Sequence, residues 1–246
     1  MKTYGLIGYR LSHSFSKKYF TEKFRNEGIE GCEYDNFQID CIEEFSSLLK
    51  STPDFRGFNV TIPYKEQIIP YLDRLDPAAK EIGAVNVIKM EEDGTMIGYN
   101  SDYYGFKDSL YTFISQDVHH TALVLGTGGA AKAVVTALKH LGIPYQYVSR
   151  ISSPGILSYE QLNKEIIEQH KIIINTSPLG MYPNVETFPN IPYLFLTAQH
   201  YLYDLVYNPE ETVFMKKGRD QGAHVLNGLP MLIGQAEKAW QIWNEK

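Results

Sequence analysis

The residues around Lys65 have the types that acid–base chemistry requires. Lys65 follows a short apolar stretch, residues 57–62, which we expect to be a strand ended by Pro63, because proline has no N–H to donate. A lysine at such a corner, beside Asn59 and Thr61, can stand at the mouth of a cleft. Its ammonium can donate a proton to a developing alkoxide if a partner fixes its position. Taken alone, the pattern favours an ordinary surface lysine, because surface lysines are common.

Two later features of the sequence supply groups that could act together with Lys65. One is a carboxylate, Asp102, at the end of the segment Gly98–Asp102. The other is a glycine-rich loop that follows the apolar residues 121–125 and opens an alanine-rich helix over 130–141. In that setting, glycines permit a tight turn and let the backbone approach a pyrophosphate at the helix N-terminus. We therefore predict a dinucleotide site made by the loop Gly126, Thr127, Gly128, Gly129 and Ala130.

The strand expected over residues 145–149 ends at Ser149-Arg150, where an NAD-binding protein would carry an acidic residue for the ribose hydroxyl. An arginine at this place can hold a 2′-phosphate, so the sequence favours NADP as cofactor. Ser149 and Ser152 can add donors around that phosphate. The alternative is that Arg150 is a plain surface residue.

The remaining pattern indicates two α/β domains. Residues 1–102 are expected to form strand–helix–strand–helix–strand with an edge hairpin around Asp93-Gly94, including a helical piece over 64–69. Residues 103–227 alternate strands and helices as a parallel, doubly wound, Rossmann-like sheet does, with one helix starting at Pro209 behind an Asn208 cap. The C-terminal helix, within 228–246, is expected to return to the first domain.

Bulk composition excludes several classes of function. The chain has 246 residues, a net charge of −6 and 43% apolar residues, so it offers no basic field for nucleic acid and no membrane span. Its two cysteines and the short first apolar run fit a reducing cytoplasm without an export signal. Its seven histidines show no spacing typical of a metal site.

Seven short motifs, in order, together resemble the shikimate dehydrogenase family. They are His13-Ser14-Phe15-Ser16, Asn-Val-Thr-x-Pro-x-Lys at 59–65, Gly83-Ala84-Val85-Asn86, Asn-Thr-Ser-Pro-Leu-Gly-Met at 175–181, Asp-Leu-Val-Tyr-Asn-Pro at 204–209, Gly-Leu-Pro-Met-Leu at 228–232, and Gln235-Ala236. The resemblance implies that residues 1–102 bind the substrate and that residues 103–227 bind NADP. It implies reversible, NADPH-dependent reduction of 3-dehydroshikimate to shikimate, with Lys65 as proton donor and Asp102 orienting it. A structural ion pair between the domains is the alternative for these two residues.

The same resemblance implies the binding residues. Ser14 and Ser16 would donate to the substrate carboxylate, although either serine could instead cap the helix that begins there. Thr61, Asn86 and Gln235 would bond ring hydroxyls, Tyr207 would lie near the carboxylate, and Thr176, Met181 and Gly228 would contact the cofactor; for Met181 apolar packing is equally compatible. Arg10 and Lys17 stand where the family usually has prolines, which puts the conformation of this loop in question.

Other functions remain compatible with the sequence. A quinate or shikimate dehydrogenase that uses NAD has the same fold, and so would a non-catalytic NADP-binding regulator. Arg150 argues against the first, and the presence of both Lys65 and Asp102 argues against the second. The expected assembly is a monomer or a homodimer.

Overall fold

The computed structural model describes residues 1–9, 11, 14–52, 54–115 and 121–245. Arg10 and His13, which the sequence singles out, lie outside these residues, as does the segment 116–120. The chain divides into two compact units. The first unit comprises Met1–Ser101 with Ala236–Lys246, and the second comprises Asp102–Gln235. Both units are α/β, which confirms the predicted fold class.

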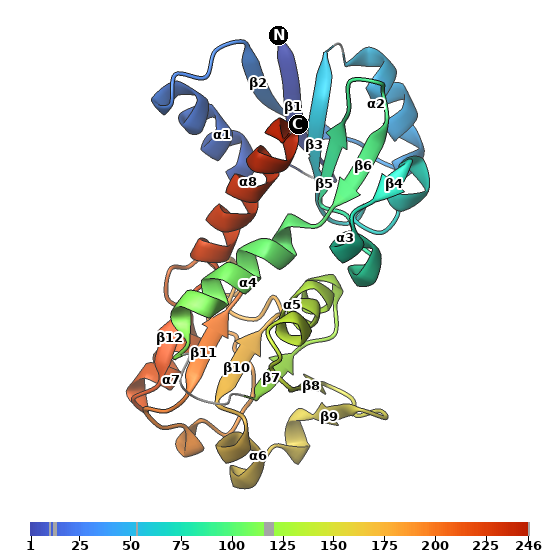
Figure 1. The fold of residues 1–246 in the computed structure, drawn as a ribbon. Coiled ribbons are helices and arrows are strands. Elements are labelled where there is room, and N and C mark those ends of the chain that lie inside the picture. Colours follow the sequence, from blue (N-terminus) through green and yellow to red (C-terminus); the bar gives the residue numbers. More distant parts are fainter. Residues whose placement is uncertain (10, 12–13, 53, 116–120, 246) are drawn as a thin grey trace. The chain divides into compact units, whose positions relative to one another are not determined.

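A six-stranded mixed sheet forms the centre of the first unit (Figure 1). Its strand order is β2-β1-β3-β5-β6-β4, with β1 parallel to β2 and β3, and β5 antiparallel to β3 and β6. The strands are β1 (Lys2–Gly8), β2 (Cys32–Gln38), β3 (Phe55–Val60), β4 (Arg74–Leu75), β5 (Val87–Met90) and β6 (Met96–Tyr99). The predicted hairpin is confirmed, with Gly94 at φ +87°. The hairpin is not the sheet edge, however, because the two-residue β4 pairs beyond it.

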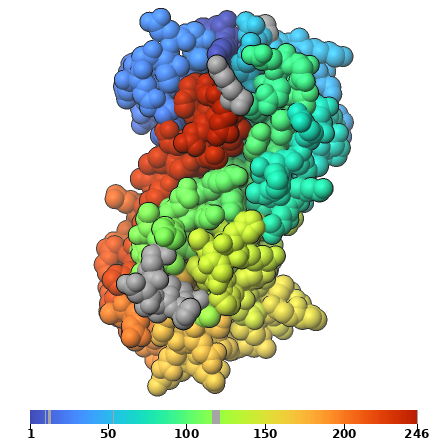
Figure 2. Space-filling view, viewed as in Figure 1, coloured from blue at the N-terminus to red at the C-terminus, as the bar shows by residue number. Residues whose placement is uncertain are grey.

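Alternation along β1 sends side chains into two separate cores. Tyr4 and Leu6 pack with Phe20 of α1 (Phe15–Asn26) and Trp243 of α8 (Leu229–Asn244). In the space-filling view the C-terminal part of α8, in red, lies against the blue atoms of α1 (Figure 2). Ile7 points to the other core, which gathers around residues of α2 (Phe45–Ser51) and of the hairpin. The sheet of the first unit is therefore covered on both faces.

Local signals set the shorter helices of the first unit. Asp76 caps α3 (Pro77–Ile82) by accepting from two backbone amides, and Gly83 ends it at φ +71°. Residues 42–51 form a 3-10 turn, η1 (Ile42–Glu44), that leads directly into α2. The helical piece predicted over 64–69 is a turn followed by η2 (Ile69–Tyr71). The Lys65 carbonyl accepts from the Val85 N–H at 2.7 Å, so it is not used in a continuing helix.

The second unit contains a six-stranded sheet in which every pair is parallel. Its order is β12-β11-β10-β7-β8-β9, which reads 6-5-4-1-2-3 when β7 is counted as the first strand. This is the doubly wound order of dinucleotide-binding folds, and it confirms the Rossmann-like prediction. The strands are β7 (Ala122–Leu125), β8 (Tyr145–Ser149), β9 (Ile156–Ser158), β10 (Ile172–Asn175), β11 (Tyr201–Asp204) and β12 (His224–Leu226). The short edge strand β9 is not predicted from the sequence.

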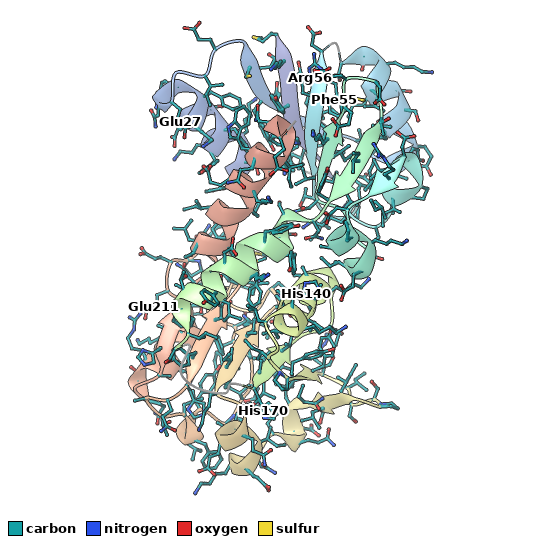
Figure 3. All side chains as sticks on the ribbon, in the orientation of Figure 1. Glu27, Phe55, Arg56, His140, His170 and Glu211 are labelled. Carbon is teal, nitrogen blue, oxygen red and sulfur yellow. The ribbon has the colours of Figure 1, made fainter. Side chains whose placement is uncertain are left out.

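Helices α4 (Ser101–Phe113), α5 (Gly129–His140), α6 (Lys164–Gln169) and α7 (Val213–Asp220) complete the second unit, together with the start of α8. His140, labelled in Figure 3 at the end of α5, hydrogen-bonds through Nδ1 to the Tyr103 hydroxyl of α4 at 2.7 Å. The prediction of a helix starting at Pro209 is wrong, because Thr212 is the residue that caps α7 by accepting from the Met215 N–H. Among the described residues, no helix has the length and apolar character needed to cross a membrane.

Candidate active site

The glycine loop lies at the carboxyl end of β7, beside β10, where the strand order of the second unit reverses. Ligands of open α/β sheets bind at this kind of crevice. Gly126 has φ +116°, and a Cβ atom there would approach Thr176 Oγ1 to 2.7 Å, so the two sides of the crevice touch at a position that only glycine fits. Thr176 is itself fixed, since its Oγ1 donates to the Leu125 carbonyl at 2.9 Å.

The next two glycines face open space. Cβ atoms added at Gly128 or Gly129 would meet nothing within 4 Å, and Thr127 and Ala130 are exposed. Gly128 caps α5, a twelve-residue helix with no acidic side chain in its first turn. Behind the loop, Ala131 is buried against the sheet. This arrangement fits a pyrophosphate, because the helix N-terminus offers free N–H groups and no repelling carboxylate.

Arg150 follows β8, the neighbour of β7, and is exposed. Ser149 ends the strand, and Ile151 beyond it is 81% exposed. Among residues 149–153, Arg150 is the only charged residue. A guanidinium at this end of the sheet suits the 2′-phosphate of NADP better than the bare hydroxyl of NAD.

A buried carboxylate organises the loops that follow β10 and β11. Asp204 is 0% exposed, and its Oδ1 accepts from Asn175 Nδ2 at 2.9 Å and from the Val206 N–H at 3.0 Å. Its Oδ2 accepts from Thr212 Oγ1. Burial raises the Asp204 pKa to about 6, although these three donors act in the opposite direction. The loop carrying Thr176 and Met181 and the loop carrying Tyr207 are thus tied to one side chain.

Close backbone packing fixes the start of α8. A Cβ on Gly228 would fall 2.1 Å from the Leu205 carbonyl oxygen, so no residue larger than glycine fits at this position. A Cβ on Gly105 of α4 would fall 2.5 Å from the Met231 carbonyl and 2.8 Å from the Gln235 amide. Helices α4 and α8 therefore touch through their backbones within the second unit, and this contact positions Gln235.

In the first unit, Ser14 immediately precedes α1 and Ser16 lies in its first turn. Ser14 caps the helix, because its Oγ accepts from the Lys17 N–H at 3.2 Å. Ser14 therefore caps α1, and because it acts as an acceptor there, its own proton is still available to a further acceptor. The Lys17 ammonium forms an ion pair with Asp35 at 2.5 Å, both side chains being about half exposed.

Thr61, Lys65 and Asn86 lie at the same end of the first unit's sheet. Thr61 follows β3, and its N–H donates to the Ile7 carbonyl of β1 at 2.9 Å. The bond between the Lys65 carbonyl and the Val85 N–H joins the lysine turn to the segment that contains Asn86. The Asn86 carbonyl accepts from the Val60 N–H at 2.9 Å. Backbone pairing therefore gathers these predicted substrate residues at one end of the sheet.

The site residues are divided between the two units. Ser14, Ser16, Thr61, Lys65 and Asn86 belong to the first unit, whereas Asp102, Tyr207 and Gln235 belong to the second, as do all the predicted cofactor residues. Asp102 lies in the first turn of α4, where a helix favours a negative charge. Among the described residues, no group of three or more His, Cys, Asp and Glu side chains could hold a metal ion.

Sequence reasoning missed four buried polar side chains that support the site. They are Tyr34, Ser101, Asp204 as a loop organiser, and Thr212. The sequence does not reveal the first and last of these, because Tyr34 lies in an amphipathic strand whose pattern indicates a core residue. Thr212 lies in a stretch whose pattern indicates the interior of a helix. A polar residue at the end of an apolar strand, as at Asp204, is the signal that points to such a role.

Comparison with known proteins bears on this architecture. A family model for the shikimate dehydrogenase substrate binding domain matches residues 6–88. A curated relative from Clostridium beijerinckii, named shikimate dehydrogenase (NADP(+)), is 42% identical over 254 residues, covering 100% of this chain and 93% of the relative. The chain belongs to the shikimate dehydrogenase family. The resemblance seen in the seven motifs is thereby confirmed.

Solved structures of the shikimate dehydrogenase family agree with this assignment. A shikimate 5-dehydrogenase from Thermus thermophilus, in complex with NADP(H) and shikimate, is 28% identical with a TM-score of 0.84, covering 99% of this chain and 94% of that one. One from Listeria monocytogenes, in complex with shikimate and NAD, is 26% identical with a TM-score of 0.89, covering 100% and 92%. Structures of this family thus include complexes with either nicotinamide cofactor.

Proposed function

We propose that the protein is an NADP-dependent shikimate dehydrogenase, an oxidoreductase of aromatic amino acid biosynthesis that interconverts 3-dehydroshikimate and shikimate. The observation that carries this proposal is the match over the whole chain to a relative named shikimate dehydrogenase (NADP(+)). The glycine loop at the switch point of the second unit supports it, because its open face fits a pyrophosphate. The second unit, with a predicted extent of residues 103–227, is the cofactor domain. The first unit, predicted as residues 1–102 with the C-terminal helix, is the substrate domain.

The predicted roles divide the chemistry among named residues. When bound, NADPH supplies the hydride for the substrate carbonyl. Lys65 donates the proton to the developing alkoxide and accepts it in the reverse direction, and Asp102 orients the ammonium and bonds a substrate hydroxyl. Ser14 and Ser16 hold the carboxylate, Tyr207 lies near it, and Thr61, Asn86 and Gln235 bond the ring hydroxyls.

The cofactor residues follow from the same division. Gly126, Thr127, Gly128, Gly129 and Ala130 hold the pyrophosphate, and Ser149 and Arg150 hold the 2′-phosphate. Thr176, Met181 and Gly228 line the nicotinamide end. Support for this last group comes from close packing: Gly126 against Thr176 and Gly228 against Leu205 fix the four loops that follow β7, β10, β11 and β12 at the carboxyl end of the sheet.

A matrix of four assays tests the function. The purified protein is given shikimate or quinate with NADP⁺ or NAD⁺, and the reduced cofactor is followed by absorbance. We expect the highest kcat/KM for shikimate with NADP⁺. Equal or better rates with NAD⁺ or with quinate would assign the protein to the quinate-type alternative. Binding of NADPH without turnover of either substrate would identify a non-catalytic regulator.

A further inference from the structure

A cavity of about 870 Å³ lies in the first unit, at the end of the sheet where β1 and β3 begin. This volume is within the range of small-molecule pockets. Four cationic residues line the cavity, and each belongs to a strand of the sheet: Lys2, Arg56, Arg74 and Lys89. The predicted substrate residue Thr61 follows the opposite end of β3, and five residues of strand span about 17 Å. The cavity is therefore separate from the candidate active site.

A β-bulge directs Arg56 into this cavity. Along β3, Phe55 and Gly57 pair with consecutive residues of β1, so Arg56 is the extra residue between them. Phe55 and Phe58 accordingly pack in the same core, although regular alternation would place them on opposite faces. Figure 3 labels Arg56 at the end of β3 beside the start of β1. Bulges of this kind re-aim a side chain and are functional features of a sheet.

The Arg56 guanidinium lacks an acceptor that it needs. The residue is partly buried, and its Nε atom is fully buried without a hydrogen-bond partner among the described residues. Lys2, Arg56 and Arg74 form no ion pair with any residue that the structure describes. A buried donor without an acceptor is costly and rare in native proteins. A bound oxyanion would supply the acceptor, because a guanidinium matches carboxylate and phosphate oxygens.

The charges around the cavity leave an excess of cations. Four acidic residues also line it: Glu91, Glu92, Asp93 and Glu245. Two of them are neutralised by ion pairs, Glu91 with Lys89 at 3.0 Å and Glu245 with Lys238 at 3.5 Å. The other two are exposed at the hairpin turn between β5 and β6. Three cations without an ion pair thus face two exposed carboxylates, which favours an anionic ligand.

The wall of the cavity is fixed by close packing. Trp243, which lines it, donates from Nε1 to the Ile88 carbonyl at 2.9 Å, and a Cβ on Gly57 would fall 2.1 Å from the same nitrogen. Lys89 is only 7% exposed, and its ammonium donates at 2.8 Å to the backbone carbonyl that follows α8. The cavity is therefore formed before any ligand enters, as ligand pockets usually are.

We propose that this cavity binds a small molecule that carries a phosphate or carboxylate group, held by Arg56 with Lys2 and Arg74. Both groups present the same chemistry to a guanidinium, namely oxygen atoms that accept two hydrogen bonds. Met90 and the edge of Trp243 provide apolar lining for the rest of the ligand. The proposal goes beyond the dehydrogenase function and does not depend on it.

Calorimetric titration at constant ionic strength tests the site, with inorganic phosphate and succinate as the two probes. NADP⁺ is present throughout, so that the glycine loop of the second unit is not open to the probe. We expect the wild-type protein to bind at least one probe, and Arg56→Met to bind it about 10- to 150-fold more weakly, as for a lost charge-assisted hydrogen bond. Lys50→Met, at an exposed position of α2 outside the cavity, is the matched control and should bind as the wild type does.

Thermal unfolding provides a second measurement. Arg56→Met removes the buried donor that has no acceptor, so without either probe it should melt at or above the wild-type temperature. The probe should raise the melting temperature of the wild type more than that of Arg56→Met, because only the wild type has the complete site. Lys2→Gln, at an exposed position, should also weaken binding and serves as the comparison if Arg56→Met does not fold.

The outcomes separate the possible ligands. Binding of phosphate alone would identify a phosphorylated ligand, and binding of succinate alone would identify a carboxylate ligand. Failure of the wild type to bind either probe would overturn the proposal, as would equal binding by wild type, Arg56→Met and Lys2→Gln. A wild-type protein that does not turn over shikimate would refute the proposed function and leave this site unaffected.

Discussion

Thr212 donates a hydrogen bond of 2.6 Å from Oγ1 to Oδ2 of Asp204, and through it the cap of α7 is tied to the end of β11. The acceptor is a fully buried carboxylate. Thr212 also accepts from the Met215 N–H, so one hydroxyl serves both the helix and the strand. This bond explains why α7 begins at Val213 and why residues 209–211 remain outside it.

The raised pKa of Asp204 predicts a pH dependence of stability. Its folded pKa of about 6 exceeds the ordinary value of 3.8, so the folded protein holds the extra proton between these values. The stability that Asp204 contributes is complete below pH 3.8 and is lost as the pH rises through 6. Asp204→Asn, which keeps the shape, should therefore gain stability relative to wild type over this range in urea unfolding.

The difference between the two proteins is the quantity to measure, because His200 titrates with the opposite sign. Burial lowers the His200 pKa, so the unfolded chain takes up a proton first and stability falls as the pH drops below 6.5. Subtracting the wild-type curve from that of Asp204→Asn cancels this contribution. A difference that stays flat from pH 4 to 6 would contradict the assignment to Asp204.

Replacing Lys65 tests the proton-transfer step. Lys65→Ala should lower kcat by about 10²- to 10⁴-fold, because both the proton donor and its charge are lost, while shikimate binding changes much less. Lys50→Ala, at an exposed position of α2, is the matched control and should retain full activity. A Lys65→Ala enzyme that keeps more than about a tenth of the wild-type kcat would make Lys65 structural.

Ser14 offers a way to separate helix capping from substrate binding. Ser14→Ala removes both the cap and the hydroxyl, whereas Ser14→Gly removes the hydroxyl at a much smaller cost to the helix, since glycine is tolerated at the cap. Both variants should raise the KM for shikimate, by a factor of up to about 10². Only Ser14→Ala should lower the melting temperature appreciably. Recovery of a normal KM in the glycine variant would show that the cap alone matters.

Cofactor choice depends on Arg150. Arg150→Ala should raise the KM for NADPH roughly 10- to 150-fold with little change for NADH, because only NADPH presents a phosphate to the guanidinium. Added salt should weaken the preference of the wild type, since the contact is exposed. Arg25→Ala, on α1 of the first unit, is the control. Equal use of both cofactors by the wild-type protein would remove the basis of this prediction.

Two glycine substitutions should affect different properties, one the stability of the second unit and the other cofactor binding. Gly105→Ala inserts a Cβ 2.5 Å from the Met231 carbonyl and should destabilise the second unit by about 1–3 kcal/mol. Gly129→Ala meets nothing within 4 Å and should leave stability unchanged while weakening NADPH binding by obstructing the approach of the pyrophosphate. Melting temperature and cofactor affinity, measured on both variants, check this. Loss of stability in Gly129→Ala would show that the loop is structurally constrained.

The parts of the fold that could be predicted are those with a strong local pattern. Four strands of the second unit, β7, β8, β10 and β11, are four or five residues long and alternate with helices, and α3 carries both Asp76 and Gly83 as end signals. The strands β4 and β9 are two and three residues long, too short for any periodicity to appear. The start of α7 was missed because the partner of Thr212 lies eight residues away, on a strand.

The candidate site was located from the sequence through motifs rather than through geometry. The seven motifs contain the residues assigned to the substrate, whereas the glycine loop and Arg150 were located by their places after expected strands. Tyr34 lies outside all of these segments and meets Asn59 across 25 residues of chain. Only the parallel pairing of β2 with β1, and of β1 with β3, brings these two side chains together. Long-range sheet register of this kind is not encoded in any local stretch of sequence.

The aromatic core of the first unit has an optical consequence. The chain contains two tryptophans, Trp240 and Trp243, and both belong to this core, where Trp243 lies 4.9 Å from Tyr4 and 5.5 Å from Phe20 between ring centroids. Indole emission therefore reports on the first unit alone, whereas backbone circular dichroism reports on both. Denaturation curves recorded by the two signals coincide only if the units unfold together. The native protein thus carries its own fluorescent label for the unit that we propose binds the substrate.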